Sequence, residues 1–257
     1  MKKERQNEIL KLVIQERRVK LTKLVEQFGV SMETVRRDIN DLVKTGRVRK
    51  VYGGIEYISE NTSIIDVEDW DKRMEFHSTE KAMIANCMVN LIPDRSTILL
   101  DAGTTTHYLA KLLHIKKDLT IFTYSIITAS ELMRRCNHSV YVIGGKLLRS
   151  EQVTTGTFAN SFLDNIASID LFISTADGIT LENGVTDFYE DVAAIKRSFV
   201  AKANSTIVLA DNSKFGRITP FVSCRIENIK QLVTDSGTPQ YYIDGLRSAG
   251  VEVFLTE

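Results

Sequence analysis

The apolar residues between positions 21 and 42 follow the spacing of two short amphipathic helices. The first helix carries its apolar stripe, spaced i, i+3, i+4 and i+7, at Leu21, Leu24, Val25 and Phe28. Gly29 follows where many helices end in a left-handed residue. A second stripe, at Val35, Ile39 and Leu42, begins just after Ser31, which is a favourable N-cap. Helix, glycine turn and capped helix is the order of a helix-turn-helix.

The flanking segments complete a small domain. Apolar residues between positions 5 and 16 predict a third helix, and two β-prone runs, 47–52 and 55–58, flank Gly53-Gly54. A glycine pair between such runs predicts a hairpin with a two-residue turn. We therefore expect a winged helix-turn-helix domain over residues 1–58, with the helix-turn-helix at about 20–39.

The chain beyond residue 75 alternates short apolar runs with helical patterns. The predicted strands are 97–100, 119–122, 140–143, 171–173, 206–210 and 251–255. Continuously apolar strands alternating with helices predict a mainly parallel sheet covered on both faces. The fold class is therefore α/β, with a second domain over 75–257. Residues 59–69 are polar at first and aperiodic, and the chain becomes helical in pattern from Trp70. We place a linker at 59–74.

Charge separates these two parts. Residues 1–57 contain 14 Lys and Arg against 8 Asp and Glu, while the whole chain has 33 of each and a formal net charge of zero. A basic first domain on an acidic body predicts that the first domain meets phosphates. We expect a cytoplasmic protein without a membrane segment, because neither a signal peptide nor a long apolar run is visible. Three widely spaced cysteines and four scattered histidines predict no disulfide, metal or cofactor site.

The second helix of the helix-turn-helix is the candidate DNA reader. With Val35 facing the core, Arg37 points nearly the opposite way and Arg36 lies on the flank. The alternative is a solvated surface helix with an Arg37–Asp41 pair. We expect Arg37 and Thr34 to approach base edges, and Arg36, Arg49, Lys50 and Tyr52 to contact phosphate or an adjacent groove. The predicted DNA-binding set is Ser31, Thr34, Arg36, Arg37, Arg49, Lys50 and Tyr52.

Small polar residues follow several predicted strands. Asp101-Ala102-Gly103-Thr104-Thr105-Thr106 leads from a strand directly into a helix, where free amides and hydroxyls favour an anion. It lacks the spacing of a P-loop or a dinucleotide fingerprint, and a helix-capping turn is the alternative. Gly144-Gly145, the run 175–178 and the run 211–216 follow other strands, and ligands bind at such strand ends. Lys214 would supply a point charge for phosphate, and Lys196 either a similar charge or a structural one.

The chain resembles the DeoR/GlpR family of bacterial transcriptional regulators. In the first domain the resemblance is carried by Arg5, Ile9, Leu10, Leu24, Phe28, the run Val30-Ser31, the run 34–38, Leu42, Gly46 and Gly53-Gly54. In the second it is carried by Glu80-Lys81, Asp101, the run 103–106, Gly144-Gly145, Gly156, Asp170, Gly184, Lys196, Asp211 and the run 213–216. The resemblance implies an effector domain of the ribose-5-phosphate isomerase and CoA-transferase-like type, which senses sugar phosphates or related metabolites and assembles a homodimer or homotetramer.

Two positions depart from the pattern of the family. Tyr124 stands where the family usually has an asparagine facing the pocket, and Val192 stands where an acidic residue is common. The predicted effector-binding set is Asp101, Gly103, Thr104, Thr105, Thr106, Tyr124, Gly145, Asp177, Gly178, Lys196, Asp211 and Lys214.

The predicted function is that of a DNA-binding regulator rather than an enzyme. We expect a repressor of a sugar-catabolic operon that binds double-stranded operator DNA and is relieved by a small phosphorylated metabolite. One alternative is a sugar-phosphate isomerase or deaminase with a DNA-binding head, whose carboxylate base would be Asp101, Asp177 or Glu182. Another is a second domain that serves only oligomerisation.

Overall fold

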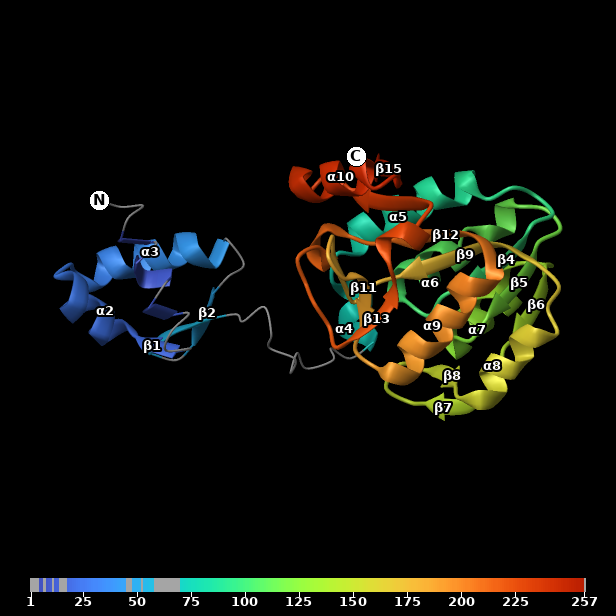
Figure 1. Ribbon diagram of the computed structural model, residues 1–257, viewed down its shortest axis with the longest axis horizontal. Coiled ribbons are helices and arrows are strands. Elements are labelled where there is room, and N and C mark those ends of the chain that lie inside the picture. The colour runs from blue at the N-terminus through green and yellow to red at the C-terminus, as the bar shows by residue number, and fades with distance from the viewer. Residues whose placement is uncertain are drawn as a thin grey trace. The chain divides into compact units, whose positions relative to one another are not determined.

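The computed structural model describes residues 5–6, 8–10, 12–13, 18–44, 48–51, 53–57 and 70–256 (Figure 1). The chain divides into two compact units, residues 1–65 and 66–257. No helix among the described residues is long and apolar enough to cross a membrane.

The first unit contains the predicted helix-turn-helix. α2 (Leu21–Phe28) ends at Gly29, whose φ of 59° is left-handed, and α3 (Met32–Lys44) follows. Val35, Ile39 and Leu42 are buried, as the periodicity predicted. They pack with Leu24 of α2 and with Ile9 of the preceding helical residues. The apolar faces of these helices bury one another in this way.

A small antiparallel sheet completes this unit. β2 (Val48–Val51) pairs with β3 (Gly54–Tyr57) as the predicted hairpin, and β1 (Arg18–Lys20), which the sequence did not predict, pairs with β3 on its other side. Val51 pairs with Gly54, so Gly54 belongs to the strand. The prediction that Gly53 and Gly54 together form the turn is therefore wrong by one residue. The winged helix-turn-helix fold is confirmed.

The second unit is built on a seven-stranded sheet in which every neighbouring pair is parallel. Its order is β15-β14-β12-β9-β4-β5-β6. The strands are β4 (Thr97–Leu100), β5 (Thr120–Thr123), β6 (Ser139–Val142), β9 (Ile169–Thr175), β12 (Ala203–Leu209), β14 (Gln231–Asp235) and β15 (Glu252–Thr256). The predicted α/β class is confirmed, and β14 is the strand of this sheet that the sequence did not predict.

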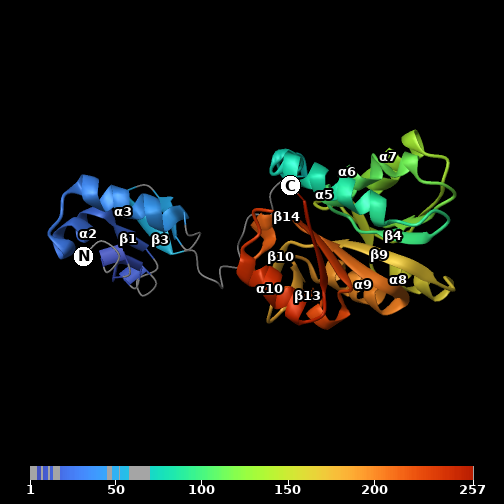
Figure 2. The ribbon, with the colours of Figure 1, turned by 90° about the horizontal axis from the view of Figure 1, so that it is seen from above.

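Helices cover both faces of this sheet, as Figure 2 shows. α5 (Ser78–Leu91), α6 (Thr104–Ala110) and α7 (Ile126–Arg135) cover one face, and α8 (Thr157–Asp164), α9 (Glu190–Lys202) and α10 (Gln240–Ser248) the other. Ile98 and Leu100 pack on the first set of helices, while Leu99 packs on the second. Alternate side chains of a strand point to opposite faces, so a strand covered twice is apolar throughout.

Smaller elements surround the carboxyl ends of the strands. They are α4 (Trp70–Glu75), the hairpin β7 (Lys146–Leu148) and β8 (Val153–Thr155), and the antiparallel sheet of β10 (Gly178–Thr180), β11 (Gly184–Asp187) and β13 (Phe221–Cys224). Short 3-10 helices occupy Leu113–Ile115, Asn212–Lys214 and Ile226–Asn228. All of α4 but its last residue falls in the span 59–74 assigned to the linker. Trp70 is buried and lies edge-on to His107 of α6, so this helix is packed against the second unit.

The strand order places the crevice of the sheet. β4 lies beside β9, and the chain runs outward from β4 through β5 and β6 before it returns to β9 on the other side. Two loops therefore diverge at the carboxyl ends of β4 and β9. In open parallel sheets, ligands bind at such a switch point.

Candidate functional sites

The outward face of α3 presents the predicted DNA-reading residues. Ser31 caps the helix, because its Oγ accepts a hydrogen bond of 3.2 Å from the Thr34 amide, and the two hydroxyl oxygens lie 3.0 Å apart. Arg36 is exposed, and the Arg37 side chain is 75% exposed and paired with Glu33 at 2.6 Å. This surface pair costs little to open, so the guanidinium of Arg37 is accessible to DNA.

Two of the remaining predicted DNA contacts lie on β2 of the wing. Lys50 is exposed in β2. Arg49 belongs to the same strand, but its side chain lies outside the described residues, as does all of Tyr52.

A buried ion pair fixes α3 against the amino-terminal helical residues. Asp38 is 1% exposed and its Oδ2 lies 2.6 Å from Nε of Arg5. Gln6 donates to the other carboxylate oxygen at 3.2 Å. Asp38 and Arg5 are two of the positions that carry the family resemblance, and this contact gives them a structural role.

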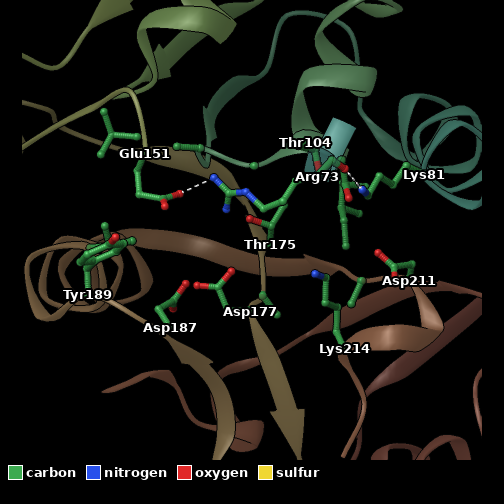
Figure 3. Close-up of a pocket in the computed structure, with 18 of the residues that line it drawn as sticks. Arg73, Lys81, Thr104, Glu151, Thr175, Asp177, Asp187, Tyr189, Asp211 and Lys214 are labelled. Carbon is green, nitrogen blue, oxygen red and sulfur yellow. Dashed lines mark hydrogen bonds and ion pairs between the residues drawn. The ribbon is translucent and has the colours of Figure 1, made fainter. Parts of the chain in front are cut away.

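A pocket lies where β4, β5, β9 and β12 end (Figure 3). It brings together seven residues of the predicted effector set, which are Gly103, Thr104, Thr105, Tyr124, Asp177, Asp211 and Lys214. Asp101, Thr106 and Lys196 lie behind this lining and are buried. Gly145 and Gly178 do not line it. A Cβ at either position would come within 2.4 Å of a backbone carbonyl oxygen, so close backbone packing explains both glycines.

Asp101 ties the ends of β4 and β9 together. Its carboxylate is fully buried and accepts hydrogen bonds from the Thr175 amide at 2.7 Å, the Ala102 amide at 2.7 Å and the Tyr124 hydroxyl. Burial by itself raises the pKa of Asp101, but Lys196 and these hydrogen bonds outweigh it and lower the pKa below its usual value. Asp101 is therefore ionised at neutral pH and belongs to the framework of the site.

Lys196 of α9 is buried between two carboxylates. Its Nζ lies 2.8 Å from Asp101 Oδ2 and 2.8 Å from Asp187 Oδ1, and it donates to the Thr175 carbonyl at 2.8 Å. Burial lowers the pKa of Lys196, but the two carboxylates more than offset it and raise the pKa above its usual value. An ammonium has three protons, and these three acceptors use them. This arrangement fits the structural alternative for Lys196.

Several charged residues of the lining were not predicted. Arg73 of α4 donates to Glu151 at 2.7 Å, and Lys81 of α5 donates to the carbonyls of Arg73 and Phe76. Asp187 also lines the pocket. Arg73 lies in the span assigned to the linker and Glu151 in a hairpin without a strong apolar pattern, so neither carried a local signal.

A helix-turn-helix with an exposed arginine face, followed by an α/β unit with a polar pocket, defines a DNA-binding transcriptional regulator. Residues 5–61 match the family model of the DeoR-like helix-turn-helix domain, and residues 76–236 match that of the DeoR C-terminal sensor domain. The chain belongs to the DeoR family.

Similar proteins align over nearly the whole chain. The HTH-type transcriptional regulator GolR of Listeria innocua is 32% identical over 254 residues, 99% of this chain and 98% of that protein. The transcriptional repressor AccR of Agrobacterium fabrum is 32% identical over 236 residues, 91% of this chain and 90% of that protein. Among solved structures, ribose 5-phosphate isomerase A of Methanocaldococcus jannaschii covers 54% of this chain and 55% of that chain, with 16% identity and a TM-score of 0.41.

Proposed function

We propose that this protein is a transcriptional repressor whose α3 reads operator DNA and whose pocket binds a phosphorylated sugar or a related metabolite that relieves repression. The proposal that α3 reads DNA is supported by the exposed arginine side chains on this helix. One such helix reads a short sequence, so we expect two heads of a homodimer or homotetramer on half-sites about one helical turn apart.

The position of Lys214 is the main support for the proposal that the pocket binds a phosphorylated effector. It is half-buried beside the pocket, and Figure 3 shows its amino group pointing into it. Within the described part of the chain no ion pair neutralises this amino group. Thr104 and Thr105 add hydroxyl groups to the same lining. A cation without a partner beside hydroxyl donors is suited to a phosphate ester.

The repressing sense rests on relatives. AccR is named a transcriptional repressor, and its alignment covers 91% of this chain and 90% of that protein. An effector relieves repression only if it binds the DNA-competent and DNA-incompetent arrangements with different affinities.

The test compares Lys214→Ala with the wild type. The DNA probe is the region upstream of the gene, located first by footprinting, and binding is followed by fluorescence anisotropy with and without a panel of sugar phosphates. We expect the variant to bind the probe normally and to lose the response to the effector. Lys230→Ala, an exposed lysine away from the pocket, is the matched control. A normal response of Lys214→Ala to millimolar effector would remove Lys214 from the site.

The enzyme alternative finds less support in the geometry. Asp101 is ionised, buried and fully hydrogen-bonded, and Glu182 is exposed and lies outside the pocket lining. Asp177 is the nominated base that lines the pocket. The relatives are named as regulators. Turnover of ribose 5-phosphate or amino-sugar phosphates by the full chain would reverse this conclusion. Thermal shifts with the same compounds separate a sensor from a module that serves only oligomerisation.

A further inference from the structure

The charges that line the pocket do not match a simple anion. Within the described residues, four carboxylates line it (Glu151, Asp177, Asp187 and Asp211) against three cations (Arg73, Lys81 and Lys214). Arg73 is already paired with Glu151. A phosphate group of charge about −1.5 to −2 adds to an excess of negative charge. A ligand that complements these charges would carry a positive group in addition to its phosphate.

Three lining carboxylates have a buried oxygen without a hydrogen-bond partner among the described residues: Glu151 Oε1, Asp187 Oδ2 and Asp211 Oδ2. Of the three, Asp187 lies next to the carboxylate of Asp177 (Figure 3), which makes it the position for that group. The Asp187 side chain is 5% exposed, and its Oδ1 is paired with Lys196. Its Oδ2 is buried and has no hydrogen-bond partner among the described residues, although Asp187 lines the pocket. A buried polar atom without a partner is unfavourable, and buried polar atoms in folded proteins are nearly always paired. A donor from a ligand would pair with this oxygen.

Asp177 adds a second negative charge at the same place. Figure 3 shows the carboxylates of Asp177 and Asp187 on the same side of the pocket. Burial first, and then the charges of Asp177 and Asp101, raise the pKa of Asp187 to about 6, against the opposing effect of Lys196. Burial first, and the charge of Asp187 among the later causes, raise the pKa of Tyr124 after β5 and of Cys224 in β13.

A bound metal ion does not account for the two neighbouring carboxylates of Asp177 and Asp187. No group of three or more His, Cys, Asp and Glu in the described part of the chain is arranged to hold a metal ion. An ammonium group, in contrast, carries one charge and three donors, and so satisfies two neighbouring carboxylates from one small volume.

We propose that the effector is a zwitterion, a phosphate ester that also carries a protonated primary amine. Its phosphate would lie near Lys214, and its ammonium group would lie against Asp187 and Asp177. This inference rests on the proposed function and specifies its ligand: an amino-sugar or amino-alcohol phosphate is bound in preference to the corresponding hydroxyl compound.

The experiment measures affinity of the full chain by calorimetry with probes that differ in one group. The probes are inorganic phosphate, then aminoethyl, aminopropyl and aminobutyl phosphate, each compared with the hydroxyalkyl phosphate of the same length. Such flexible probes do not depend on the stereochemistry of a sugar. Hydrogen bonds to charged groups lead us to expect a preference of about tenfold or more for the amine at the best length.

Substitutions then assign the preference to residues. Asp187→Asn should abolish the preference for the amine and retain binding of the hydroxyalkyl phosphate, and Asp177→Asn should reduce the preference. Glu182→Gln, an exposed carboxylate outside the lining, is the control and should keep it.

Asp187→Asn removes a partner of Lys196, so a pH series on the wild type provides a second test. The ratio of amine to alcohol affinity should fall as the pH falls through about 6, where Asp187 takes up a proton. The alcohol of equal length corrects for titration of the phosphate.

The outcomes separate the two proposals. Equal affinity of amine and alcohol at every length, or a preference that Asp187→Asn and Asp177→Asn both leave intact, overturns the zwitterion while phosphate binding through Lys214 stands. If neither phosphate nor any phosphate ester binds the wild type, the proposed function fails and this inference fails with it.

Discussion

Lys196→Met would remove the positive charge from a buried site that holds two carboxylates. The Lys196 side chain is 2% exposed, and Asp101 and Asp187, each 2.8 Å from its Nζ, are 0% and 5% exposed. Methionine fills much of the same volume without charge. Asp101 retains its hydrogen bonds from Thr175 and Ala102, but neither carboxylate would retain this cation.

The expected loss of stability is large for a single substitution. Breaking a buried ion pair by removing one partner costs about 3–5 kcal/mol, because an uncompensated charge stays behind. For a unit of this size, about 2–4 °C of melting temperature is lost per kcal/mol, so the second unit should melt roughly 6–20 °C lower.

The loss should depend on pH in one direction. Burial already raises the pKa of Asp187 to about 6 in the presence of Lys196, and removing the cation raises it further. When the pKa of a carboxyl group is higher in the folded state than in the unfolded state, its ionisation destabilises the folded state. The full penalty applies at pH values above the folded-state pKa. This penalty disappears as the pH falls through the folded pKa toward the unfolded value of about 3.9. The deficit of Lys196→Met relative to the wild type should therefore shrink as the pH falls from about 8 to about 6, and level off below that, where Asp187 of the wild type also takes up a proton.

Scanning calorimetry of wild type and variant over that range measures both quantities. Lys202→Met, in the last turn of the same helix, is the control for loss of a lysine without loss of the buried pair. A deficit below about 1 kcal/mol, the scale of a surface pair, would refute the reasoning. A deficit that does not change with pH would also refute it, because then the carboxylates are not its source.

Three further predictions concern the first unit. Arg37→Ala should cost about 1–3 kcal/mol of operator affinity and relax sequence preference, measured by anisotropy on matched and altered sites, and equal affinity would contradict its role. Lys50→Ala should lower the slope of log affinity against log salt by about 1 with little change in sequence preference, and an unchanged slope would exclude a phosphate contact. Gly29→Ala should cost about 1–2 kcal/mol, because φ is 59° there while nothing lies within 4 Å of the added Cβ. An unchanged melting temperature of this unit would show that the turn relaxes.

Much of the fold could be predicted from local patterns in the sequence. Val35, Ile39 and Leu42 are buried because their spacing puts them on one face of a helix, and Ser31 caps that helix because its hydroxyl lies next to a free amide. The strand Thr97–Leu100 is apolar throughout because helices cover both of its faces. Residues at the carboxyl ends of parallel strands share one edge, so the loops after β4, β9 and β12 could be predicted to meet.

Tertiary structure alone decided how the charges are distributed within that pocket. Lys196 and Lys214 are both lysines close to strand ends, yet one is enclosed by Asp101 and Asp187 and the other points into the pocket. Arg73 and Glu151 meet from elements far apart in the chain. A helix or strand period is set by neighbours within one element, whereas an ion pair depends on the packing of distant elements. The sequence therefore determined the two domains and the edge where a ligand would bind, and the folded chain determined which charges face it.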